Sequence, residues 1–130
     1  MNSLRSPLGR ALGLGAAKSG TAHWWAQRVS AVALIPLGLW FLFSLLLLPN
    51  LEYATVRAWL GTPLGSFFAV LLVGVLAYHS YLGTNVVAED YVHAPGARLA
   101  TLVALRFAYV LAAGAGIFAI LRIAFAAPVP

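Results

Sequence analysis

His79 is the residue whose type and position carry the most chemical information. It lies near the middle of a long apolar run, between Tyr78 and Ser80. A polar side chain inside a membrane is costly, and it commonly serves a function. A neutral imidazole at such a place needs a hydrogen-bond partner or a metal ion. The spacing alone leaves two interpretations open: a metal ligand, or a histidine that bonds a neighbouring helix.

Gly83 lies four residues beyond His79, on the same face of a helix because residues i and i+4 stack. A glycine one turn from a histidine leaves a flat slot that a porphyrin plane can enter. In membrane helices a glycine more often permits close contact between two helices. The pair therefore indicates a haem site only in combination with other residues.

A second polar group follows at the end of the same run. Asp90 lies eleven residues after His79, and Tyr91 follows directly. Eleven residues of helix return to within about 20° of the same face and rise about 16 Å, which would place Asp90 above His79 at the membrane surface. A phenol can donate to a carbonyl oxygen and a carboxylate can pass protons, which suits the reduction of a quinone. The plain alternative is that Asp90 and Tyr91 end the helix at the interface, where tyrosine is common.

Arg28 lies about one turn into another apolar run, and His23 lies just before it. A guanidinium binds a carboxylate in a bidentate way, and haem propionates are carboxylates; the alternative is that Arg28 snorkels to the surface. His23 and His93 both lie near a membrane surface, about 15 Å from the depth of His79 at the helical rise. They cannot share one iron with His79. A haem with two axial histidines would therefore need its second histidine from another chain.

The elements that position these residues must be membrane helices. The chain has 130 residues, of which 62% are hydrophobic and 8% charged, against about 25% charged in soluble domains. The net charge of +5 comes from residues at the ends of the apolar runs, which favours membrane topology over nucleic-acid binding. Since the chain has no cysteine, it can form no disulfide and cannot hold an iron–sulfur cluster alone.

Three apolar runs are long enough to cross a bilayer, which takes about 20 residues of helix. They cover residues 24–48, 63–87 and 99–125. Proline and glycine separate the runs, as expected where helices end. The sequence predicts an all-α anchor domain over residues 23–130, preceded by a basic tail over residues 1–22. Its three transmembrane helices would form part of a haem-binding bundle.

The basic residues indicate how the chain is oriented. The tail and the start of the first span carry four of them, Arg5, Arg10, Lys18 and Arg28. The first loop carries only Arg57, whereas the second carries Arg98. By the positive-inside rule, the N-terminus and the second loop lie in the cytoplasm and the C-terminus in the periplasm. Arg106, within the third run, would snorkel or pair with Asp90. Pro36 is expected to bend the first span, because it frees a carbonyl one turn earlier.

Taken together, these residues resemble a family signature. The segment from His79 to Tyr91, with Gly83 four and Asp90 eleven residues after the histidine, resembles the H-x-x-x-G and D-Y pattern of the succinate dehydrogenase hydrophobic membrane anchor subunit. The opening at residues 23–31 is similar to the start of the first span in alphaproteobacterial members. The sister cytochrome subunit carries an H-R-x-T-G-like start and an R-H pair, which are absent here. The likeness covers nearly the whole chain.

The resemblance implies a role for each of these residues. His79 would be an axial ligand of the iron of haem b, which is shared with a partner subunit, and Gly83 would border the haem. Arg28 and His23 would lie near the propionates. Tyr91 would hydrogen-bond ubiquinone, with Asp90 beside it.

The resemblance also implies a setting in the cell. The chain would anchor a complex with a cytochrome b subunit, an iron–sulfur subunit and a flavoprotein subunit in a bacterial inner membrane, and would have no active site of its own. Two other classes stay open. One is a fumarate reductase-type anchor linked to menaquinol. The other is a non-redox membrane subunit for assembly or transport, in which His79 is a satisfied buried histidine.

Overall fold

The computed structural model describes residues 6–8 and 20–126, and the part from residue 20 onward is built from helices. The elements are α2 (Gly20–Leu47), α3 (Tyr53–Leu60), α4 (Pro63–Tyr91) and α5 (Pro95–Ala124). No strand occurs among the described residues. Most of the predicted basic tail, residues 1–22, lies outside them.

The three long helices confirm the three spans predicted from the sequence. They contain 28, 29 and 30 residues, and each is long and apolar enough to cross a membrane. At the helical rise each is about 42 to 45 Å long, more than the roughly 30 Å of hydrocarbon in a bilayer. α2 and α5 begin four residues before the predicted spans, and α4 ends at Tyr91 rather than at residue 87. Helical hydrogen bonding therefore continues past the apolar runs into the interfaces.

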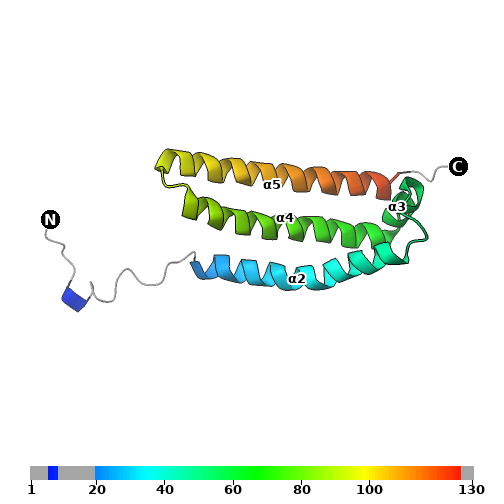
Figure 1. The fold of residues 1–130 in the computed structure, drawn as a ribbon, viewed down its shortest axis with the longest axis horizontal. Coiled ribbons are helices and arrows are strands. Elements are labelled where there is room, and N and C mark those ends of the chain that lie inside the picture. The colour runs from blue at the N-terminus through cyan, green and yellow to red at the C-terminus, as the bar shows by residue number, and fades with distance from the viewer. Residues whose placement is uncertain (1–5, 9–19, 127–130) are drawn as a thin grey trace.

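The three long helices form an open layer with α4 in the middle (Figure 1). α4 packs against α2 on one side and α5 on the other, so that it separates these two helices (Figure 1). Few side chains are buried between the helices; the buried apolar ones are Leu37, Ala69, Leu82, Ala88 and Ile120. Most large apolar side chains therefore face lipid or another chain.

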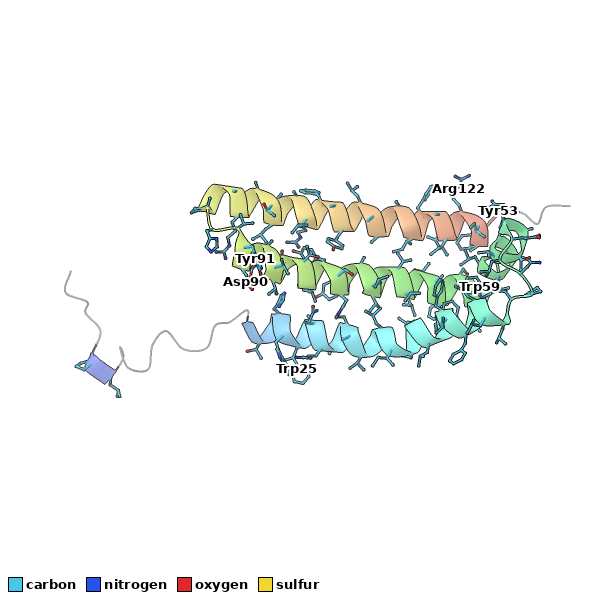
Figure 2. The ribbon with its side chains drawn as sticks, viewed as in Figure 1. Trp25, Tyr53, Trp59, Asp90, Tyr91 and Arg122 are labelled. Carbon is cyan, nitrogen blue, oxygen red and sulfur yellow. The ribbon has the colours of Figure 1, made fainter. Side chains whose placement is uncertain are left out.

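The short helix α3 was not expected, because the sequence indicated only a loop between the first two spans. It folds back on the bundle, and Trp59 from α3 stacks on Trp40 from α2 with ring centroids 5.5 Å apart. Trp40 also contacts Phe68 of α4, with centroids 5.2 Å apart. This aromatic cluster joins α2, α3 and α4 at one end of the layer (Figures 1 and 2).

A tight turn then leads from α3 into α4. Thr62 caps α4, since its side chain accepts a hydrogen bond from the amide of Gly65 at 3.0 Å. Pro63 occupies the first turn, where its missing amide proton costs nothing. A β-carbon on Gly65 would clash with the carbonyl oxygen of Trp59 and lie 2.7 Å from Thr62 Oγ1. Only glycine therefore fits at position 65.

The residues that depart from the apolar pattern do not break the helices. Pro36 lies inside α2, and α2 bends toward α4 beyond its middle, as predicted (Figure 1). α5 runs without interruption through Arg106 and Arg122. A lipid-exposed helix tolerates an arginine because its long side chain can reach toward the surface.

Candidate functional site

The central feature of the candidate site is a hydrogen bond between α2 and α4. Ser30 Oγ lies 2.9 Å from Nδ1 of His79. Ser30 is buried and His79 is half-buried. Ser30 Oγ also donates to the carbonyl oxygen of Gln27, at 3.1 Å. These contacts fix one face of His79 against α2.

The two contacts of Ser30 are compatible with one particular tautomer of the His79 ring. A hydroxyl group carries one hydrogen. When that hydrogen is donated to the Gln27 carbonyl, Ser30 Oγ can accept a hydrogen bond from Nδ1–H of His79. In the neutral imidazole this leaves the lone pair on Nε2, and Nε2 has no hydrogen bond within the described part of the chain. His79 is therefore a hydrogen-bonded histidine that keeps one nitrogen free for a ligand.

Such an arrangement fits a single axial ligand of a metal. Histidines that bind metals commonly donate their other ring N–H to a neighbouring acceptor, which sets the tautomer and orients the ring. Within residues 20–126 no group of three or more His, Cys, Asp or Glu side chains could hold a metal ion. Among these residues, His79 is therefore not part of a cluster of protein ligands.

Gly83, one turn beyond His79, lies next to Gln27 of α2. A β-carbon at Gly83 would be 3.8 Å from Nε2 of Gln27, which is ordinary contact distance. The other amide atom, Oε1 of Gln27, is buried without a hydrogen-bond partner. Gly83 thus helps the Gln27 side chain to lie against α4, and its predicted place at the edge of a haem stays a prediction.

Asp90 and Tyr91 lie together at the end of α4, beside the start of α5 (Figure 2). Both are exposed, Tyr91 with 79% of its surface accessible. The carbonyl oxygen of Tyr91 is 3.1 Å from Nδ1 of His93, but neither the phenol nor the carboxylate has a hydrogen bond among the described residues. Both functional groups are free to meet a ligand or a partner chain.

His23 lies in the first turn of α2 and Arg28 in the third, and both precede Ser30, which contacts His79. Arg28 is exposed, and its guanidinium lies over the Trp24 ring, 5.5 Å from the centroid. A cation held over an aromatic face keeps its hydrogen-bond donors available. Since Arg28 makes no ion pair within the described residues, it can still bind an anion.

Sequence reasoning missed Ser30 and gave an incomplete account of Arg106. The only signal for Ser30 is a hydroxyl residue two positions after Arg28 in an apolar run. Arg106 does not pair with Asp90. It lies instead beside the tyrosines of the interface between α4 and α5.

The chain is similar to known proteins along most of its length. Residues 2–113 match the family model described as succinate dehydrogenase/fumarate reductase transmembrane subunit. The chain is 31% identical over 116 residues to the succinate dehydrogenase hydrophobic membrane anchor subunit of Rickettsia bellii, covering 89% of this chain and 93% of that one. It is 32% identical over 122 residues to the subunit of the same name from Paracoccus denitrificans, covering 94% of each.

A third relative matches a shorter part of the chain. The succinate dehydrogenase membrane anchor subunit of Reclinomonas americana is 33% identical over 92 residues, which covers 68% of this chain and 77% of that one. No solved structure matches the chain significantly. The three-span architecture agrees with these similarities, and the resemblance to a hydrophobic membrane anchor is confirmed. The chain belongs to the family of succinate dehydrogenase and fumarate reductase transmembrane subunits.

Proposed function

We propose that this chain is the membrane anchor subunit of a succinate:ubiquinone oxidoreductase, and that it holds haem b together with a cytochrome b subunit. The observation that carries the haem proposal is the hydrogen bond between Nδ1 of His79 and Ser30, while Nε2 of His79 has no partner among the described residues. The relatives named succinate dehydrogenase favour that enzyme over a fumarate reductase.

Three residues of the chain would take part in binding the cofactor. His79 would supply one axial nitrogen, and Ser30 would keep its ring in the correct tautomer. Arg28 would neutralise a propionate at the shallower end of α2. A bound haem b would supply one-electron redox chemistry. A further histidine ligand would come from the cytochrome b subunit.

At the end of α4, the exposed pair Asp90 and Tyr91 would form part of the ubiquinone site. The phenol of Tyr91 would donate a hydrogen bond to one quinone carbonyl oxygen and so favour the electron-rich, reduced form. Reduction to the quinol takes two electrons and two protons. The electrons would come from the iron–sulfur subunit, and Asp90 would pass protons from water to the quinone oxygens.

In this proposal the chain has no active site for succinate. Succinate would be oxidised in the flavoprotein subunit, which would dock with the iron–sulfur subunit on the cytoplasmic side of a bacterial inner membrane. The end of α4 and the start of α5 would face that side, because Arg28 and Arg98 lie there. The C-terminus would be periplasmic.

The test is to purify the complex from its native membrane in mild detergent and to compare wild type with His79→Ala. His93→Ala is the matched control, since His93 is exposed and lies outside the membrane-spanning part of α4. We expect a b-type reduced-minus-oxidised spectrum in wild type and in His93→Ala, together with co-purifying flavin. His79→Ala should lose or alter that spectrum.

Two results would contradict the proposal in different ways. A normal b-type spectrum in His79→Ala would remove His79 from the iron while leaving the anchor role intact. Purification of wild type without haem, flavin or partner chains would refute the anchor role itself.

A further inference from the structure

A groove lies between α4 and α5, on a different side of α4 from the Ser30 contact of His79. One stripe of α4 and one stripe of α5 line it, each with residues at helical spacings of three and four. The lining residues are Gly74, Ala77, Tyr78 and Tyr81 from α4 and Arg106, Tyr109, Val110 and Ala113 from α5. The groove encloses about 260 Å³.

The groove changes from polar to apolar along its length. Tyr81, Arg106 and Tyr109 lie at the end closer to the turn between α4 and α5, where α4 ends and α5 begins. Gly74 and Ala113 lie at the far end and expose only small apolar surfaces. The polar-to-apolar order of the lining residues matches that of an amphiphile in a membrane. Such a molecule has its polar group near the membrane surface and its chain toward the membrane centre.

The polar end of the groove has a fixed shape. The phenol oxygen of Tyr109 is 2.8 Å from Oγ1 of Thr84. The Tyr81 and Tyr109 rings meet edge to face, with centroids 6.0 Å apart. Because these contacts join α4 to α5, they hold the two helices and the groove walls in place before any ligand binds.

Arg106 is the charged group of this groove and lacks a counter-charge. It lies eleven residues after Pro95, which is roughly 16 Å from the start of α5 at the helical rise. It is exposed and makes no ion pair or hydrogen bond with any described residue. Helical side chains tilt toward the helix N-terminus, so this guanidinium can extend toward the surface at the α4–α5 turn. This guanidinium is available to an anion from outside the described residues.

We propose that the groove binds one anionic phospholipid, with its phosphate on Arg106 and an acyl chain along Gly74 and Ala113. A guanidinium matches a phosphate in a bidentate way. Tyr78 has half of its residue surface accessible. Its phenol supplies a further hydrogen-bond donor for the phosphate or ester oxygens.

The test counts the phospholipids that remain bound to the purified complex in mild detergent. Mass spectrometry and phosphorus analysis are applied to wild type, Arg106→Gln and Arg122→Gln. Arg122 is the control, since it lies in the last turn of α5, away from the groove (Figure 2). We expect wild type and Arg122→Gln to retain about one more anionic phospholipid per copy than Arg106→Gln.

A second variant tests the acyl-chain end of the groove without touching the charge. A β-carbon on Gly74 would meet nothing within 4 Å, so Gly74→Leu can extend into the groove without a backbone clash. We expect it to lose the same phospholipid while Arg106 is intact. Adding phosphatidylglycerol to delipidated protein should raise the melting temperature of wild type but not of Gly74→Leu.

The proposal stands apart from the haem assignment, because it needs only the membrane helices. Equal anionic phospholipid in wild type and Arg106→Gln would overturn it. Retention of only zwitterionic lipid by wild type would also overturn it. A crosslink from a cysteine placed at Val110 to an acidic segment of a partner subunit would do the same, since Arg106 would then have a protein counter-ion.

Discussion

Replacing Ser30 with alanine removes the hydroxyl that is hydrogen-bonded to Nδ1 of His79. Alanine suits a helix interior, so the backbone of α2 should stay as it is. The Nδ1–H group would then lose its partner and the ring would no longer be held in one tautomer. The haem proposal predicts a change in the properties of the iron centre, whereas a purely structural bond predicts a change in stability alone.

The size of the effect follows from the hydrogen bond. An intramolecular hydrogen bond contributes about 0.5 to 1.5 kcal/mol, and leaving a buried donor unpaired costs about 1 to 3 kcal/mol. A one-electron potential changes by 59 mV for each tenfold change in an equilibrium constant. If the whole hydrogen-bond energy of about 0.5 to 1.5 kcal/mol acted on one oxidation state of the iron, the midpoint potential would shift by roughly 20 to 65 mV. A ring that donates from Nδ1–H is the more basic ligand and favours ferric iron. Ser30→Ala should therefore raise the haem midpoint potential.

The measurement is a redox titration of the b-type absorption in the intact complex, with low-spin electron paramagnetic resonance as a second signature. Ser44→Ala is the matched control, because Ser44 lies in the same helix and is half-buried but has no hydrogen bond to another element. Ser30→Thr keeps the hydroxyl and should restore the wild-type potential.

The reasoning would be refuted by an unchanged potential and spectrum in Ser30→Ala when wild type contains haem. An equal shift in Ser44→Ala would also refute it, since the effect would then not depend on the contact with His79. Absence of haem from wild type would reject the cofactor assignment itself.

Three further substitutions test other parts of the molecule. Tyr91→Phe should lower succinate–ubiquinone activity about tenfold, which corresponds to the loss of one hydrogen bond of roughly 1.4 kcal/mol. Succinate–dye activity and the haem spectrum should stay unchanged. An equal loss of activity in both assays would place the effect outside the quinone site. Gly65→Ala should destabilise the protein by about 1 to 3 kcal/mol, because the new methyl group overlaps the Trp59 carbonyl. Thermal unfolding in detergent measures this loss of stability. The control Gly114→Ala should melt like wild type, since Gly114 has open space around it. Arg28→Gln should lower the haem midpoint potential, because it removes a positive charge near the propionates. This shift is opposite in sign to that expected for Ser30→Ala. An unchanged midpoint potential would show that Arg28 does not lie near the haem.

Much of the fold and part of the site were determined by the sequence alone. The three spans follow from the length of the apolar runs, because a helix in lipid must satisfy its backbone hydrogen bonds internally. The prediction that His79, Asp90 and Tyr91 are functional rests on the cost of placing polar groups in or near hydrocarbon. Their spacing along one helix is fixed by 3.6 residues per turn, and therefore needs no tertiary information.

Only the tertiary structure decided which residues meet across helices. Ser30 and His79 are 49 positions apart in the chain, and their contact depends on how α2 is rotated and aligned against α4. The groove at Arg106 likewise depends on the alignment of α4 against α5. In a soluble helix a polar face reveals the rotation. In these helices the faces toward lipid and toward neighbouring helices are both apolar, so the sequence carries no such signal and packing alone sets the partners.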